Sequence, residues 1–344
     1  MKSHRIACKN TWLSLGVVAL CALLAVSSDV PPARAADPIA LAIGTSRDPN
    51  NGGLLMVAKD MNYFRDSGLN VTLKYFPSGG DLVNAVASQA LFIGSGGSVP
   101  TTTLRAGGYN AVILAQQADI SDAQQIVAQK DVVNPKDLEG KKIGALFGTV
   151  SEMLVNSMIQ HYHLQRDKIT LVNLGPPDQI TALLRGDIAA AALWTPWSSQ
   201  AIKGGAHLLV SGLHSYVPGH SGAINLVGDH SLLFASKDWV DKNPAIVTAV
   251  LKSLLQAQRF VASDPAKAAE IIGRELQVPQ AEMQSMMTHD RFSMAIDAKL
   301  VRDMNNLASF LYSNGSLKTP VKAADWIDTG PLRSIAPNMV KWHS

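Results

Sequence analysis

The run Ile39-Ala40-Leu41-Ala42-Ile43-Gly44 and the helical pattern that follows it at 54–64 form the first unit of an alternation that decides the fold. A short and almost uniformly apolar run suits a parallel strand that is buried on both faces of its sheet. Strands that alternate with helical stretches indicate an α/β fold. The first series continues with expected strands at 71–76, 91–94 and 111–115 and an expected helix at 82–88.

A second series of the same kind follows. Expected strands at 142–146, 169–174 and 188–194 alternate with expected helices at 150–162 and 180–185. The two series share an architecture without a sequence repeat, which predicts two α/β lobes of similar plan. Short apolar segments at 124–129 and 231–235 could carry the chain between the lobes, and two crossings would make a hinge. From Ala245 onward the apolar spacing is helical.

Residues 1–35 have the order of a secretory signal peptide. Lys2, Arg5 and Lys9 precede an apolar run at 12–26, and the motif Ala33-Arg34-Ala35 follows it. The run is short for a membrane-spanning helix, which is one alternative. Lipid attachment at Cys21 is the other, but Leu20 stands where a lipobox normally has a small residue. We expect cleavage after Ala35 and localisation in the periplasm.

The mature chain divides into three expected segments. The first part of lobe 1 lies at 36–123, lobe 2 at 124–232, and the second part of lobe 1, with the C-terminal helices, at 233–344. The signal peptide takes four of the 30 basic residues and one of the 27 acidic ones, so the remaining charges balance. No basic field therefore indicates nucleic acid as a partner.

Signatures of catalysis and of metal binding are missing from the mature sequence. Cys8 and Cys21 are the only cysteines, and both lie in the expected signal peptide. No HExxH or GxSxG motif occurs. His161 and His163 are two residues apart, which places them on different faces of a helix. We expect no enzymatic activity, no metal and no cofactor, while either His214 or His220, in a glycine-containing loop, could touch a ligand.

Two turns between a strand and a helix are candidate anion sites. The first contains Ser78, Gly79 and Gly80, and the second is the run Gly148-Thr149-Val150-Ser151. Unpaired amides at a helix N-terminus, together with the helix dipole, attract anions. Both turns also match a capping box, Ser78 with Asp81 and Thr149 with Glu152, which would satisfy the same amides internally.

The glycine-rich run at 94–98 contains a further candidate, Ser95. The run lacks the lysine of a P-loop and the glycine spacing of a dinucleotide-binding fingerprint. Its glycines suit a close approach of the backbone to a small ligand.

Several motifs resemble those of the sulfonate/nitrate/taurine-type solute-binding proteins of ABC importers, in order and in spacing. The matching runs are Glu139-Gly140-Lys141-Lys142-Ile143-Gly144, Phe147-Gly148-Thr149-Val150-Ser151, Asn173-Leu174-Gly175-Pro176-Pro177-Asp178, Arg185-Gly186-Asp187 and Trp194-Thr195-Pro196. The likeness extends back to 58–64 and forward to 239–244. It covers most of the mature chain.

This resemblance implies a type II periplasmic-binding-protein fold, in which two α/β lobes joined by a two-strand hinge hold the ligand in a cleft. It carries ligand contact onto both candidate turns and onto Trp194, and it places the loop Thr45-Ser46-Arg47 at the same cleft. Arg47 could bind a sulfonate or a carboxylate through a charge-assisted hydrogen bond. A solvated loop arginine is the alternative.

Thr195 departs from the family's pattern, because these proteins commonly have an acidic residue there. Without that acid, the resemblance implies an anion with an apolar body rather than a zwitterion. The expected partners are a small, sulfonate-like organic anion and the permease subunits of the importer, and the expected state is a monomer. An enzyme on the same fold, similar to pyrimidine-precursor synthases, and a sensory ligand-binding module are the alternatives.

Overall fold

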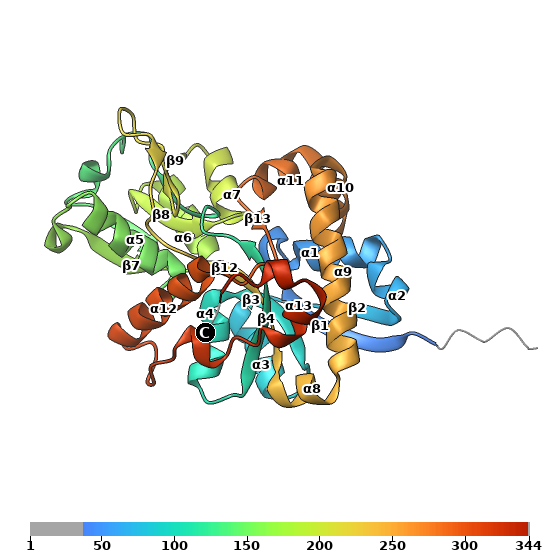
Figure 1. Ribbon diagram of the computed structural model, residues 1–344. Helices are drawn as coiled ribbons and strands as arrows, with labels where there is room; N and C mark the ends of the chain where they lie inside the picture. Colours follow the sequence, from blue (N-terminus) through green and yellow to red (C-terminus); the bar gives the residue numbers. More distant parts are fainter. Residues whose placement is uncertain (1–36, 343–344) are drawn as a thin grey trace, which may run out of the picture. The chain divides into compact units, whose positions relative to one another are not determined.

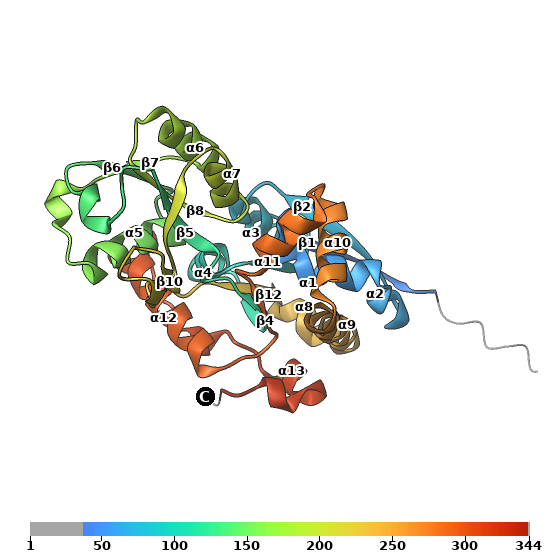
Figure 2. The same cartoon turned by 90° about the horizontal axis from the view of Figure 1, so that it is seen from above.

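The computed structural model describes residues 37–342. The predicted signal peptide at 1–35, with its cleavage site and both cysteines, lies outside the described residues. The described chain forms two sheets with helices packed on them (Figures 1 and 2), which confirms the α/β fold class.

The first sheet has the strand order β13-β4-β12-β3-β1-β2. Strand β1 pairs in parallel with β2 and β3, whereas β12 runs antiparallel to β3 and β4. Its strands are β1 (Ile39–Ser46), β2 (Leu69–Phe76), β3 (Ile93–Gly97), β4 (Ala111–Asp119), β12 (His230–Ser236) and β13 (Arg291–Phe292).

The second sheet has the strand order β11-β10-β9-β5-β8-β6-β7. Strand β6 pairs in parallel with β7 and β8, and β5 runs antiparallel to β8 and β9. Its strands are β5 (Gln124–Ala128), β6 (Lys142–Ala145), β7 (Thr170–Asn173), β8 (Ala190–Trp194), β9 (His207–Ser211), β10 (His214–Ser215) and β11 (Gly222–Ala223). The two sheets therefore repeat one plan, in which three parallel strands adjoin an antiparallel one.

Helices connect most of the strands. They are α1 (Pro49–Asp60), α2 (Tyr63–Asp66), α3 (Gly79–Ala87), α4 (Ser98–Ala106), α5 (Val150–His161), α6 (Pro176–Arg185), α7 (Trp197–Lys203), α8 (Lys237–Lys242), α9 (Pro244–Ser263), α10 (Pro265–Leu276), α11 (Gln280–Met287), α12 (Ala298–Ser313) and α13 (Gly330–Ile335). Short 3₁₀ turns lie at 135–138, 166–168, 323–325 and 337–339.

Two expected elements differ from the structure. The first helix, predicted at 54–64, begins at Pro49 and is interrupted at Asn62, whose φ of 60° is left-handed. The segments at 124–129 and 231–235, predicted to cross between the lobes, are mostly the interior strands β5 and β12. The chain instead passes from one sheet to the other at 120–123 and returns at 224–229.

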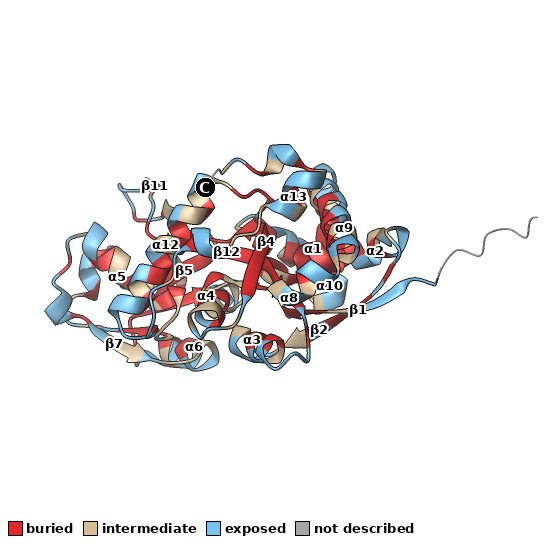
Figure 3. Ribbon diagram, turned by 60° about the horizontal axis from the view of Figure 1, so that its bottom comes forward, coloured by how far each residue is buried: buried red, intermediate tan, exposed pale blue. Residues whose placement is uncertain are grey.

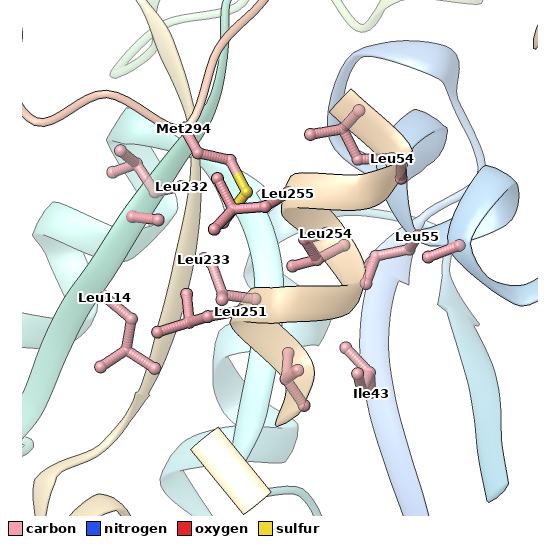
Figure 4. Close-up of a cluster of buried hydrophobic side chains, with 14 of the residues drawn as sticks. Ile43, Leu54, Leu55, Leu114, Leu232, Leu233, Leu251, Leu254, Leu255 and Met294 are labelled. Carbon is pink, nitrogen blue, oxygen red and sulfur yellow. The ribbon is translucent and has the colours of Figure 1, made fainter. Parts of the chain in front are cut away.

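The core of the first sheet lies between its strands and α1 and α9. Figure 4 shows Leu251, Leu254 and Leu255 of α9 directed toward side chains of β4 and β12. In Figures 1 and 2 α9 (orange) lies beside α1 (blue), although the two helices are far apart in sequence. By length and composition α9 could span a bilayer. Its buried apolar stripe identifies it instead as a core helix.

A second apolar cluster lies against the second sheet. Leu307 and Leu311 of α12 are completely buried in it, together with Leu154 and Val155 of α5. Helix α12 therefore contributes to the core of the second sheet, although it follows β12 in the chain. Figure 3 shows β4 buried along its whole length, next to the point where the chain leaves the first sheet. The lobe boundaries given above remain a prediction.

Candidate ligand-binding site

The carboxyl ends of β1 and β3 bring two predicted contact residues together. Thr45 and Ser95 are paired across the two strands, and neither side chain is exposed to solvent. Ser95 Oγ donates a hydrogen bond of 2.5 Å to the carbonyl oxygen of Asn51, and it accepts one from the Gln117 side chain. Ser95 therefore anchors the first turn of α1 to the sheet.

Asp48 starts helix α1. Its carboxylate accepts a 2.7 Å hydrogen bond from the Asn51 amide, and it also accepts from the Asn51 side chain. Burial raises the pKa of Asp48, and the hydrogen bonds from Asn51 oppose that rise. This cap was not predicted from the sequence. The pair Asp48-Pro49 nevertheless indicates it, because an N-cap aspartate followed by proline at the first helical position is typical of a helix start.

One buried hydrogen bond joins the junction after β8 to the first turn of α1. Thr195 Oγ1 donates to Asn50 Oδ1 over 3.3 Å, and both residues are buried. The Thr195–Pro196 peptide bond is cis. Trp194, just before it, is half-buried and pairs with Gln124 at the start of β5. Strand ends of both sheets therefore meet at this point.

The turn before α3 is capped by its own side chains. Ser78 Oγ accepts from the Asp81 amide at 3.1 Å and donates to the Asp81 carboxylate at 2.7 Å. Ser78 and Gly80 are exposed, and the Cα of Gly79 faces Pro100 of α4. The structure thus supports the capping alternative for Ser78 itself.

The turn before α5 is also capped. Thr149 Oγ1 accepts from the Ser151 amide at 3.2 Å and donates to the Leu146 carbonyl at 2.6 Å. Glu152 accepts a 2.8 Å bond from the Gly148 amide. Val150 packs in the core of the second sheet. Within residues 37–342 no hydrogen bond connects this turn with the turn before α3.

Arg47 is directed toward α10. Its guanidinium is exposed, donates to the carbonyl oxygen of Glu275 at 3.2 Å and lies 6.0 Å from the centre of the Tyr75 ring. Neighbouring Ser46 is half-buried at the end of β1. These contacts support the alternative in which Arg47 is a surface residue.

Several buried polar atoms in the described chain have no hydrogen-bond partner. Near the first turn of α1 they are Thr45 Oγ1, Asn51 Oδ1, Gln117 Oε1 and both carboxylate oxygens of Asp290. Around the second sheet they include Ser151 Oγ and Ser198 Oγ. Buried polar groups are nearly always paired in folded proteins. Such a gathering is therefore unusual for a purely structural region.

The crossing between the sheets is held by a different set of carboxylates. Asp229 accepts from Gln124 at 3.0 Å and from the His230 amide at 2.9 Å, while Asp119 accepts from Ser121. Burial raises the pKa of Asp229 to about 6. Burial acts on Asp119 in the same direction, but His230, Ser121 and Lys299 outweigh it and lower its pKa to about 2.

Helix α12 contributes the countercharges of this crossing. Lys299 Nζ lies 3.0 Å from Asp119 and 2.7 Å from Asp303, and Asp303 lies 3.0 Å from His230 Nε2. We refer to Asp119, Asp229, His230, Lys299 and Asp303 as the crossing network. The resemblance did not point to it, because its members come from strands and a helix far apart in sequence.

A pocket of about 320 Å³ opens beside the crossing network. Its lining is polar and partly aromatic, with His289 bonded to Asp122 at 2.7 Å. The lining residues are Asp119, Asp122, Leu213, His214, Tyr216, Thr288, His289 and Arg291. His214 therefore faces this pocket, which contains none of the predicted contact residues, and His220 lies on an exposed turn.

His161 and His163 do not form a metal site. His161 is exposed and packs edge-on against Tyr162, and His163 has a left-handed φ of 52°. Across residues 37–342 there is no group of three histidine, cysteine or acidic side chains placed to hold a metal ion.

Comparisons with known proteins give a consistent family likeness. The model of the NMT1/THI5-like family matches residues 49–268, more than half of the chain. The chain is 28% identical over 227 residues to the taurine-binding periplasmic protein of Escherichia coli, an alignment covering 66% of this chain and 67% of that protein.

Solved structures show the fold. The periplasmic aliphatic sulphonate binding protein SsuA of Escherichia coli superimposes with a TM-score of 0.71 at 21% identity, covering 85% of this chain and 92% of SsuA. DszB is a desulfurization enzyme, and its cysteine-to-serine variant was solved in complex with biphenyl-2-sulfinic acid. This structure superimposes with a TM-score of 0.65 at 17% identity, covering 86% of this chain and 98% of DszB. Binding proteins and an enzyme thus share this fold.

Proposed function

The chain belongs to the NMT1/THI5-like family, and we propose that it is the solute-binding component of an ABC importer, which captures a small organic anion where its two sheets meet. The observation that carries the proposal is the buried hydrogen bond between Thr195 and Asn50. It joins the carboxyl end of β8 in one sheet to the helix that follows β1 in the other. Ligands of open α/β sheets bind at such strand ends.

A sulfonate-like ligand is favoured over other anions. The relatives that bind taurine and aliphatic sulphonates support this choice. The predicted contacts remain Thr45, Ser46, Arg47, Ser78, Gly79, Gly80, Ser95, Gly148, Thr149, Val150, Ser151, Trp194 and Thr195. Among them, Ser151 is the best-placed polar group near the N-terminus of α5, because its hydroxyl is buried without a partner.

Binding without chemistry is the second part of the proposal. DszB was solved with a cysteine replaced by serine and a sulfinic acid bound, so an enzyme with a reactive thiol is the natural rival. Cys8 and Cys21 are the only cysteines in this sequence, and both precede the described residues. The likeness to periplasmic binding proteins supports export to the periplasm and delivery of the ligand to permease subunits. We further propose that the chain functions as a monomer.

A thermal-shift panel tests the proposal. Alkyl and aryl sulfonates, nitrate and carboxylates are added singly to the purified chain that begins at Ala36. At least one sulfonate is expected to raise the melting temperature, because a ligand bound only by the native state stabilises it. The ligand should be recovered unchanged by mass spectrometry. A panel without any shift, or a chemically altered ligand, would contradict the proposal.

The Glu152→Gln variant tests which turn binds the anion. The Glu152 carboxylate already accepts from the Gly148 amide, so it competes for the same positive helix end. Removing its charge should tighten sulfonate binding by roughly two- to fivefold, the equivalent of about 0.3–1 kcal/mol for a charge at a helix N-terminus. Asp81→Asn, at the other turn, is the matched control. If only Asp81→Asn changes the affinity for the sulfonate, the anion binds at the turn before α3.

A further inference from the structure

Two helices that pack in different cores meet at an ion pair. Lys203 Nζ, in the last turn of α7, lies 2.6 Å from Glu282 Oε2, in the first turn of α11. Helix α7 buries Ala201 against the second sheet, whereas α11 buries its methionines, among them Met283, against the first sheet. Figures 1 and 2 show the two helices side by side. The pair therefore joins parts of the chain that belong to different sheets.

The segment that follows α11 makes a second polar contact of this kind. His289 Nδ1 lies 2.7 Å from Asp122 Oδ2, at the point where the chain crosses between the sheets. The same side chain accepts a hydrogen bond from Ser211, at the end of β9 in the second sheet. Burial acts to raise the pKa of Asp122, but the hydrogen bonds from His289 and Ser211 outweigh it and lower that pKa. The carboxylate is therefore ionised near neutral pH and can only accept, so His289 donates through Nδ1.

We refer to residues 280–291, from the start of α11 to the start of β13, as the strap. In the described chain no cluster of buried apolar residues contains side chains of both α7 and α11. A pocket of about 320 Å³ is lined both by Thr288 and His289 of the strap and by His214 and Tyr216 of the second sheet, so the two are not tightly packed there. Parting the strap from α7 therefore breaks the ion pair without breaking an apolar core.

The strap and α7 are connected to the junction where the solute is proposed to bind. Helix α7 begins directly after Thr195 and the cis peptide bond to Pro196. Helix α11 packs against α1, whose first turn contains Asn50. The hydrogen bond between Thr195 and Asn50 and the ion pair of the strap therefore join the same two parts of the molecule. A movement that separates α7 from α1 and α11 would break both contacts.

We propose that the strap latches the two sheets together through Lys203–Glu282 and His289–Asp122, and that this latch sets how tightly the solute is held and how strongly the affinity depends on ionic strength. The inference rests on the proposed function and adds a regulation of the same site. The side chain of Lys203 is 60% exposed and that of Glu282 25% exposed, so their attraction is modest and is screened by salt. Such a latch favours the closed arrangement and still permits release of the solute.

Energy transfer between two fluorophores tests the latch without any solute. The expected mature chain has no cysteine, so Thr181→Cys on α6 and Gln256→Cys on α9 place one exposed label beside each sheet. Lys203→Met should lower the ratio of the shorter to the longer separation by roughly two- to fivefold, as expected for an exposed ion pair. Sodium chloride at about 0.5 M should lower the ratio in the chain that retains Lys203, but not in the variant.

A second variant and a matched control complete this experiment. His289→Ala removes the other contact of the strap and should also lower the ratio. Lys267→Met breaks an ion pair of the same length, 2.6 Å to Glu270, but within α10 alone, and should leave the ratio unchanged. An unchanged ratio in Lys203→Met or in His289→Ala, or an equal change in Lys267→Met, would overturn the proposal.

Isothermal titration measures the consequence for affinity. The probe is the sulfonate that gives the largest thermal shift in the panel above, and Lys203→Met and Glu282→Gln should each weaken its binding by roughly two- to fivefold. Each charge also suits the dipole of its own helix, so the double variant is needed, and it should bind no more weakly than either single variant. Additive losses or unchanged affinities would refute the latch. If no sulfonate binds, the proposed function fails, and the energy-transfer ratio still decides whether the latch exists.

Discussion

The buried carboxylates of the crossing network and the single buried carboxylate of Asp290 lie close together, because Arg291 bonds to Asp119, but they differ in their hydrogen bonds. In the crossing network, Asp119, Asp229 and Asp303 each accept from a named donor. At the first turn of α1, Asp290 accepts from none. Within the described chain, the crossing network leaves His230 Nδ1 unpaired, but each of its carboxylates has a donor. Paired polar groups rigidify their surroundings, whereas unpaired buried ones cost stability. The difference indicates that the carboxylates of the crossing are structural, whereas we expect Asp290 to cost stability.

Breaking the crossing network should give the largest effect. Asp303→Ala leaves His230 and Lys299 without their shared carboxylate, and removal of one partner from a buried ion pair costs about 3–5 kcal/mol. Urea denaturation should show this loss of unfolding free energy. Arg302→Ala is the control, because that side chain is largely exposed and only 3.6 Å from the same carboxylate. If Asp303→Ala costs no more than the control, the crossing network is not structural.

The free energy of unfolding should vary with pH because Asp229 ionises differently in the folded and the unfolded chain. Its folded pKa of about 6 lies above the ordinary value of 3.8, so the fold favours the protonated form. That contribution is fully present below about pH 4 and is lost as the pH rises through 6, by about 3 kcal/mol at 1.36 kcal/mol per unit. Asp119 has the opposite effect, because the fold lowers its pKa and so favours its ionised form. The stabilisation from Asp119 is therefore lost as the pH falls from about 4 to 2.

The Asp229→Asn variant isolates this dependence. The free energy of unfolding of wild type minus that of the variant should decline between pH 4 and pH 6.5. A difference that stays constant across this range would show that Asp229 ionises normally in the folded chain.

Asp290→Asn should have the smallest effect on stability and the opposite sign. Asparagine removes an unpaired buried acid that burial disfavours, so the ligand-free chain should gain roughly 1 kcal/mol of unfolding free energy at pH 7. Urea denaturation of Asp290→Asn and Asp303→Ala under the same conditions compares their changes in unfolding free energy. A loss as large as that of Asp303→Ala would mean that Asp290 has a structural partner.

Most of the fold could be predicted from local patterns. Strand β1 was expected at 39–44 and spans Ile39–Ser46, and β8 was expected at 188–194 and spans Ala190–Trp194. Apolar runs and helical spacing are local signals, so the alternation of strands and helices was readable. The position of β5 and β12 as interior antiparallel strands could not be predicted, because strand order depends on contacts between distant segments.

The candidate site was only partly predictable. Glycine and serine at strand ends identified the two turns and Ser95. Asp48 could have been found from the Asp-Pro pair, which resembles the helix starts recognised at Asn243-Pro244 and Asp264-Pro265. Gln117 lies inside an apolar strand and Asp290 far along the chain, and no spacing in the sequence shows that both approach the first turn of α1.

A crystal structure of the chain with a sulfonate that raises its melting temperature tests the central claim most directly, since it reveals where the anion binds. We expect the sulfonate where the two sheets meet, with one of its oxygens about 2.5–3.0 Å from Ser151 Oγ, which is buried without a partner. A sulfonate bound away from the strand ends of both sheets would contradict the proposed function.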